Sequence, residues 1–238
     1  MMHAQFDADA LLALWESAVG RPAPAREDAL LRALFDAVPQ ALGARNASLM
    51  EIHRRLFGRE VELLSHCPSC GTAAEFRADS EALMAQAPVV DAASPHCVES
   101  HGHRVEFRLP VAEDVAAASG SEDFVPRLLE RCVLACTREA ESVPVPRIPV
   151  AVLDAISQRM EALDPGASVS FSLECPECST RWDARLDVGQ LLWQKVQAAA
   201  EHLLLDVDAL ARVYGWTELE VLRLNPLRRA AYLQMVSA

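Results

Sequence analysis

Apolar side chains recur at helical spacing towards both ends of the chain. Within residues 7–57, Leu49, Ile52 and Leu56 fall on one helical face, and Gly58 suits the position that follows a helix. After the second cysteine pair, a further apolar stripe is formed by Leu192, Val196, Ala199 and Leu203. The pattern therefore predicts helices before residue 58 and after residue 187, each with one face turned towards a core.

Polar residues mark where several of these helices are expected to begin. In the N-terminal region the predicted N-caps are Asp9, Asp28 and Asn46. Near the other end, Thr217 and Glu220 have the spacing of a capping box. The dipeptide 225–226, an asparagine followed by a proline, predicts the start of a last helix.

The centre of the chain carries weaker patterns. Residues 85–104 predict a loop, residues 105–110 alternate as a strand does, and a helix is expected from about Pro126. That helix would place on one face Leu128, Leu129, Cys132, Val133 and Cys136. Residues 141–149 hold three prolines, which disfavour a helix and predict an extended connector.

One segment of the sequence is repeated. Residues 61–79, VELLSHCPSCGTAAEFRAD, align without gaps with residues 169–187, VSFSLECPECSTRWDARLD, at an offset of 108. In each copy a helical stretch ends near a glycine, and an extended segment leads into Cys-Pro-x-Cys. A second extended segment and a helix follow. Two copies indicate a duplicated unit, because a solenoid needs at least three repeats.

Together these elements predict an α+β fold that is mainly helical. We expect duplicated helix–β-knuckle units that share a zinc-ribbon-like centre, within one pseudo-duplicated domain over residues 1–238. Its expected parts are a first helical and CPxC unit (1–90), an insert with the proline-rich connector (91–148), a second CPxC unit (149–200) and a helical C-terminal region (201–238). A chain of this length can bury a core without disulfides.

The two CPxC pairs carry the strongest chemical signal. Two cysteines on a tight turn can bind one metal ion, but a tetrahedral zinc site needs about four ligands. We therefore predict one shared, structural Zn²⁺ site whose ligands are Cys67, Cys70, Cys175 and Cys178. Four thiolates leave zinc no open position for catalysis, so the metal would clamp the two halves of the fold. Two separate redox CxxC motifs, or unliganded surface cysteines, remain alternatives.

Other metal-competent residues occur in the centre of the chain. A loop could gather His96, Cys97, His101 and His103 around an ion, although an exposed polar loop is the simpler interpretation. The sequence does not decide whether these four residues bind a second metal. Two further cysteines, at positions 132 and 136, could also bind metal from one helical face, but their apolar surroundings favour buried thiols.

Charge and missing motifs narrow the classes of function. The chain has 22 basic and 34 acidic residues, a net charge of −12, which disfavours binding to nucleic acid and to anionic membranes. No segment has the length and apolarity of a membrane helix or the form of a signal peptide, so a cytoplasmic location is expected. Neither GxSxG, Walker A, GxGxxG nor HExxH occurs, so we expect no enzyme activity.

The C-terminal residues present a candidate partner surface. From Leu203 to Met235 there are more apolar residues than one face of each short helix can bury, which predicts an exposed patch. The candidate partner-binding residues are Trp216, Arg228, Arg229 and Tyr232. The same rhythm of helices suits a helix-turn-helix, so a zinc-ribbon regulator that contacts nucleic acid through these helices is one alternative. A segment that only closes the core is another.

The order of the motifs resembles a known family. LMEIHRRLFG, CPSCG, VEFRLP, LLERCVLAC, CPECSTRWDARLD and the ending YGWTELEVLRLNPLRRAAYLQMV follow one another along most of the chain. The chain is similar to the baseplate hub assembly proteins of T4-type contractile phages and to their relatives in bacterial extracellular contractile injection systems. This resemblance implies a non-catalytic role in baseplate structure or assembly. It also implies baseplate or hub proteins as partners, and incorporation into a phage-tail-like particle.

Overall fold

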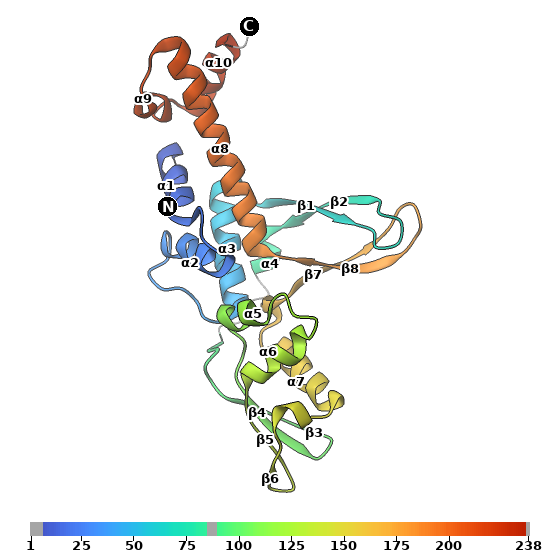
Figure 1. Cartoon of the computed structure of the whole chain (residues 1–238). Helices are drawn as coiled ribbons and strands as arrows, with labels where there is room; N and C mark the ends of the chain where they lie inside the picture. The colour runs from blue at the N-terminus through green and yellow to red at the C-terminus, as the bar shows by residue number, and fades with distance from the viewer. Residues whose placement is uncertain (1–6, 85–89, 237–238) are drawn as a thin grey trace.

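The computed structural model describes residues 7–84 and 90–236 and has a mixed α and β fold in which helix is the larger part (Figure 1). The N-terminal part contains α1 (Ala8–Ala18), α2 (Ala23–Arg32), α3 (Leu42–Phe57), β1 (Glu60–His66), β2 (Ala73–Asp79) and α4 (Ser80–Met84). The central part contains β3 (His96–Ser100), β4 (His103–Phe107), α5 (Ala112–Ala118), α6 (Phe124–Cys132), β5 (Val133–Arg138), β6 (Glu141–Ser142) and α7 (Val150–Leu163). The C-terminal part contains β7 (Val169–Glu174), β8 (Arg181–Leu186), α8 (Val188–Tyr214), α9 (Glu218–Leu222) and α10 (Pro226–Val236).

A first hydrophobic core joins the two ends of the chain. Helices α1, α2 and α3 pack with the first half of α8, and the side chains that they bury together include Leu14, Leu30, Leu49, Ile52 and Val196. The predicted stripe on α8 is confirmed at Leu192, Val196 and Leu203, which are at most 6% exposed, while Ala199 is half-buried. No helix in the described part of the chain has the length and apolarity needed to span a membrane.

A second core lies in the central part, where strands replace two predicted elements. The sheet has the strand order β3-β4-β5-β6, and its buried side chains pack with α6 and α7 around Val105, Phe107, Leu109, Leu129 and Ile156. The predicted loop over 85–104 is therefore wrong for residues 96–100, which are strand β3, and for residues 103–104, which begin strand β4; the two strands form a hairpin. Residues 85–89 lie outside the described ones. The hairpin turns at His101 and Gly102, whose φ angles of 51° and 74° suit a tight two-residue turn.

The predicted helix from about Pro126 through Cys136 is also shorter than expected. It begins at Phe124 and ends at Cys132, and the next residues form strand β5 against β4. Pairing with β4 outweighs the helical spacing of the apolar residues, since β-branched Val133 and Thr137 suit a strand. The prediction that Cys132 and Cys136 are buried is confirmed, although they do not share a helical face.

Several predicted helix starts differ in the structure. Asp7 caps α1 by accepting a hydrogen bond from the Ala10 amide at 2.8 Å, so Asp9 lies in the first turn instead. Asp28 lies within α2, and Asn46 lies within α3, where its side-chain amide donates to the carbonyl of Gly166 at 2.8 Å. At the other end of the chain, the predicted capping box of Thr217 and the last helix after Asn225 are both confirmed.

The two CPxC segments form matching antiparallel hairpins. Val61 pairs with Ala78 in the first, and Val169 pairs with Leu186 in the second, so the register is the same at the offset of 108. The strand bounds agree within one residue, and each hairpin runs directly into a helix, α4 or α8.

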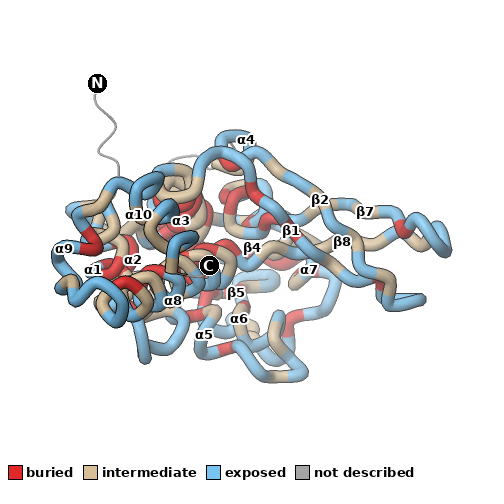
Figure 2. Tube along the Cα trace, turned by 90° about the horizontal axis from the view of Figure 1, so that it is seen from above, coloured by how far each residue is buried: buried red, intermediate tan, exposed pale blue. Residues whose placement is uncertain are grey.

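The sequence predicted that these hairpins lie at the centre of the molecule, and this prediction is wrong. They project side by side from the helices as an arm, with the cysteine turns at its tip (Figure 1). Seen from above, buried residues gather at the base of the arm and recur near its tip (Figure 2). Between base and tip, the rings of Phe76 and Phe171 meet edge to face at 5.1 Å, and Trp182 Nε1 donates to Ser65 Oγ at 3.2 Å.

Candidate metal centre

The same backbone turn presents both cysteine pairs at the tip of the arm. In the first hairpin, the Cys67 amide donates to the Thr72 carbonyl and the Gly71 amide donates to the Cys67 carbonyl, both at 2.9 Å. The second hairpin repeats these two bonds between Cys175 and Thr180 and between Ser179 and Cys175, also at 2.9 Å. Gly71 and Ser179 close the turns with φ angles of 75° and 56°. Glycine adopts this left-handed conformation without strain, and serine adopts it at some cost.

The four sulfur atoms converge between the two turns. Cys67 Sγ lies 3.6 Å from Cys178 Sγ, and Cys70 Sγ lies 3.5 Å from Cys175 Sγ. All four sulfurs lie within 4.8 Å of one another. These distances exclude disulfides, whose sulfurs are about 2.05 Å apart. They match the edge of a tetrahedron around zinc, which is about 3.8 Å when each Zn–S bond is about 2.3 Å.

Each hairpin contributes one buried and one exposed cysteine to the cluster. The first cysteine of each pair, Cys67 or Cys175, is buried between the turns, and the second, Cys70 or Cys178, is exposed. A metal ion can therefore reach the cluster from solvent, while the buried sulfurs hold it between the hairpins.

Threonines beside the exposed cysteines favour the thiolate forms. The hydroxyl of Thr180 lies 3.3 Å from Cys178 Sγ, and together with the Thr180 backbone it is the main cause that lowers the pKa of Cys178 to about 6. Although the Cys178 backbone lowers it, burial raises the pKa of Cys175 to about 11, so the thiolate is favoured on the exposed cysteines. Thr72 lies at the same distance from Cys70 Sγ and lowers the pKa of that thiol too. Since zinc binds thiolates, both shifts suit a metal site. Four uncompensated thiolates this close would repel one another, and a divalent cation relieves that repulsion.

The donor set therefore fits a closed metal site with a structural role. Four sulfur ligands complete a tetrahedron and leave no position for a water or a substrate. The arrangement links two hairpins that are far apart in the sequence, because residues 71–174 separate Cys70 of the first from Cys175 of the second.

The second group of metal-competent residues does not converge. Among the described residues, the cluster at the tip of the arm is the one group of three or more such side chains whose ligand atoms come together. His103 Nδ1 lies 3.0 Å from the His101 carbonyl, His101 Nδ1 lies 2.8 Å from Ser100 Oγ, and Cys97 is exposed on β3. Cys132, by contrast, is buried. Desolvation raises the pKa of Cys132 to about 11, so this residue stays a neutral thiol.

The candidate partner-binding residues gather near the end of α8. Trp216 stacks on Tyr214 at 4.7 Å and meets Tyr232 edge to face at 4.9 Å. Arg228 is exposed, but Arg229 turns back to α8, where its Nε lies 3.1 Å from Asp206 Oδ2. Tyr214 was not among the four candidate partner-binding residues, although it belongs to the apolar set between Leu203 and Met235 and lies two residues before Trp216. Arg229 is therefore not available to a positive stripe on the outer surface.

Apolar exposure is concentrated on the same helices. The exposed apolar residues from α8 onwards are Leu204, Leu205, Val213, Tyr214, Leu219, Leu227 and Met235. Helix α10 contains no buried residue at all. Such a surface is typical of a site that another protein covers.

Comparison with known proteins agrees with a baseplate role. The family model described as T4 bacteriophage base plate protein matches residues 37–188, which is more than half of the chain and includes both hairpins with all four cysteines. The chain belongs to this family. The match ends at the first residue of α8, so the motif-rich ending lies outside it. No curated protein and no solved structure was found to match the chain.

Proposed function

We propose that this chain is a non-enzymatic assembly factor or structural component of a contractile-tail baseplate, of the hub assembly type, and that it holds one structural zinc ion. Its family membership supports the baseplate role. The observation that carries the zinc proposal is the convergence of four sulfurs from two separate hairpins. The ion fastens the tip of the arm, and the arm presents a rigid feature to neighbouring baseplate proteins.

The proposal includes a duplicated origin for the two zinc-binding units. The matched strand bounds, the equal register and the repeated turn hydrogen bonds support it. The preceding helices support it too, because α3 begins at Leu42 and α7 at Val150, again 108 positions apart. In this interpretation the central sheet is an insertion between two copies, and the domain division stays a prediction.

Metal analysis of the purified protein tests the zinc site. We expect one zinc per chain, and we expect Cys175→Ser to lose the metal and to lower the free energy of unfolding, because three thiolates cannot complete the tetrahedron. Cys97→Ser is the matched control, since Cys97 is an exposed cysteine outside the cluster. It should keep both the metal and the stability of the parent protein.

The opposite result has a specific meaning. A fully folded protein without metal, in which Cys178 reacts rapidly with a thiol reagent, would overturn the zinc site. It would support the thiol oxidoreductase alternative, for which an exposed cysteine of low pKa is required.

For partner binding we propose the surface around Trp216, Arg228, Arg229 and Tyr232, with baseplate or hub proteins as the partners. The half-exposed aromatic cluster supports this assignment, because such rings are enriched in protein interfaces. The inward ion pair of Arg229 gives less support to the nucleic-acid alternative. Co-purification of the full chain with the other proteins of its baseplate tests this assignment. An eluate that contains none of these proteins would contradict it.

A further inference from the structure

At the tip of the arm, each exposed cysteine faces a buried cysteine of the other hairpin. Exposed Cys178 lies 3.6 Å from Cys67, which is 3% exposed, and exposed Cys70 lies 3.5 Å from Cys175, which is 2% exposed. Both contacts have hydrogen-bond geometry in which either thiol can donate, so the two sulfurs of a contact point at each other. Each contact therefore joins a sulfur that solvent reaches to one that solvent does not reach, across the gap between the hairpins.

This arrangement suits the two steps by which a peroxide oxidises a pair of thiols. The exposed sulfur attacks hydrogen peroxide, the O–O bond breaks, and the products are a sulfenic acid and one water. The facing sulfur then attacks the sulfenic sulfur, whose S–O bond breaks as a second water leaves. The two thiols lose two electrons and two protons, and one peroxide is reduced to two waters. Where the sulfurs are thiolates on a metal ion, the two protons come from solvent and the ion is released.

Only a short movement separates these contacts from bonds. A disulfide needs about 2.05 Å between its sulfurs, so each facing pair has to close by about 1.5 Å. Within each turn, Pro68 or Pro176 fixes one backbone torsion and two amide hydrogen bonds hold the chain. Between the turns, the hairpins meet through half-buried side chains such as Phe76 and Phe171. The tips can therefore approach each other more easily than either turn can change its shape.

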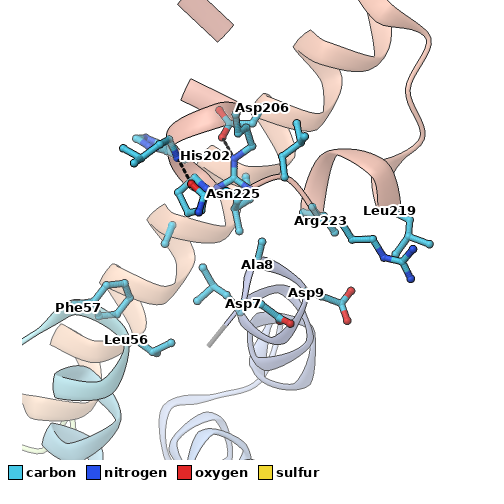
Figure 3. Close-up of a pocket in the computed structure, with 18 of the residues that line it drawn as sticks. Asp7, Ala8, Asp9, Leu56, Phe57, His202, Asp206, Leu219, Arg223 and Asn225 are labelled. Atoms are coloured by element: carbon cyan, nitrogen blue, oxygen red, sulfur yellow. Dashed lines mark hydrogen bonds and ion pairs between the residues drawn. The ribbon is translucent and has the colours of Figure 1, made fainter. Parts of the chain in front are cut away.

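The other three cysteines lack such a counterpart. Cys97 is exposed on β3, but the residue opposite it on β4 is Glu106, while Cys132 and Cys136 are buried in the second core. At the other end of the molecule, Figure 3 shows the groove between α1 and the α9–α10 segment, and none of the described residues that line it is a cysteine. Thiol oxidation is therefore directed to the tip of the arm.

We propose that the cysteine cluster is a thiol-oxidation site, at which a peroxide forms the disulfides Cys67–Cys178 and Cys70–Cys175 across the two hairpins. Both bonds join one hairpin to the other, so the arm stays closed in oxidising surroundings, where thiolate ligands do not persist. Disulfides within each Cys-Pro-x-Cys pair would instead leave the hairpins unlinked. The inference goes beyond the proposed function: it concerns the same cysteines as the zinc proposal, but it requires only their positions.

Peptide mapping of the full chain tests which bonds form. The reduced protein is treated with a stoichiometric amount of hydrogen peroxide, its remaining thiols are alkylated, and it is digested with trypsin. Cleavage after arginine leaves each cysteine pair within one peptide, 60–77 or 160–181. We expect mass spectrometry to find these two peptides joined to each other. Two separate peptides, each lighter by two hydrogens, would overturn the proposal.

Two double variants that remove the same number of metal ligands test the pairing. Cys67→Ser with Cys178→Ser keeps the facing pair Cys70 and Cys175, whereas Cys67→Ser with Cys175→Ser keeps Cys70 and Cys178, the two exposed cysteines. We expect the first variant to link its hairpins about tenfold faster or more. Cys97→Ser is the control and should link as the parent chain does. Equal rates in the two double variants would overturn the assigned pairs.

Hydrogen exchange measures the effect of oxidation on the arm. In the presence of a chelator, the oxidised chain should keep the amides of β1, β2, β7 and β8 at least about tenfold more protected than the reduced chain does. Equal protection of the oxidised and reduced chains would contradict a covalently closed arm.

Metal analysis of the reduced protein separates this proposal from the zinc site. If the reduced chain holds no zinc and peroxide still links peptide 60–77 to peptide 160–181, the zinc site fails and the oxidation site stands. If the reduced chain holds zinc and peroxide gives only disulfides within each pair, the oxidation site fails and the zinc site stands.

Discussion

A buried carboxylate shows how single residues stabilise the second core. Asp114 is 1% exposed, and it accepts hydrogen bonds from Arg108 at 2.6 and 3.0 Å, from Arg131 at 2.9 Å and from the Val111 amide at 3.1 Å. Burial alone would raise the pKa of Asp114, but these hydrogen bonds outweigh burial and hold it below its usual value. The ionised carboxylate thus ties α5 to the end of α6.

The lowered pKa gives a pH-dependent prediction. A carboxyl group whose pKa falls on folding stabilises the protein above its unfolded value of about 4, and this contribution disappears as the pH drops through the folded value. We therefore expect Asp114→Asn to lose about 3 kcal/mol of unfolding free energy at pH 7. The difference should shrink below about pH 4. Urea denaturation across this range measures it, with exposed Asp123→Asn as the control. A difference that does not change with pH would contradict the assignment.

Some residue-level features can be predicted from the sequence, and others cannot. The four cysteines and the Thr217 cap follow from short spacings within the chain. Asp164 does not: it is 3% exposed, and it accepts a hydrogen bond from the amide of Gly43, 121 residues earlier, at 3.0 Å. Only the folded chain brings these two residues together.

At the level of elements, the arm has the thinnest core. At its base, Val61, Leu63 and Val169 are buried in the first core. Further out, the two hairpins meet chiefly through Phe76, Phe171 and Trp182, which are only half-buried. Small two-stranded sheets are marginally stable alone, so the metal proposed above would stabilise the arm more than the helices.

Metal removal is expected to loosen the arm locally. If the arm holds zinc as proposed, a chelator should speed up hydrogen exchange of the amides in β1, β2, β7 and β8 by about tenfold or more. Helices α3 and α8 should keep their protection, because their amides bond within each helix and their buried side chains make up much of the first core. Hydrogen exchange with mass spectrometry measures both regions. Equal acceleration in arm and helices would contradict a local role for the metal.

The bounds of the elements were predictable where the sequence repeats. The hairpins appear at the predicted places because two aligned copies constrain each other. Strand β5 was not predictable, because Leu128, Leu129 and Cys132 continue into it at helical spacing. Its strand conformation depends on pairing with β4, which no local pattern reveals.

At the scale of the whole molecule, the C-terminal helices are attached outside the two main cores, through a small apolar cluster, the aromatic rings around Trp216 and the Arg229–Asp206 ion pair. Among residues 217–236, Val221 and Leu222 are the buried ones, and Leu222 packs with Leu12, Ala200 and Leu203 in a small third cluster. The first and second cores contain no residue from α9 or α10.

Deletion of residues 217–238 should therefore leave a folded protein. We expect it to keep its zinc and to lose about 3 kcal/mol of unfolding free energy, from the exposure of apolar side chains. Capture of baseplate proteins should be lost. Circular dichroism, metal analysis and co-purification measure the three effects. Global unfolding would show that the segment is core, and unchanged capture would remove it from the interface.

The position of the arm shows the limit of prediction at this scale. Alternation along each strand indicates which side chains face inwards within a hairpin, as at Leu63 and Phe171. It contains no information on where the hairpins attach to the helices. The predicted position of the cysteine cluster, with helices around it, is therefore wrong, and the fold holds the cluster away from the helices (Figure 1).

The clasp at the tip of the arm also has a mechanical consequence. With a metal bound, Cys70 is joined to Cys175, and residues 71–174 form a closed loop that contains the whole central sheet. Tension that pulls the two ends of the chain apart cannot extend these 104 residues until metal–sulfur bonds break. That loop would add about 350 Å of contour length when released. A metal bound at the tip would thus keep this length of chain, with the second core in it, out of reach of such tension until the clasp opens.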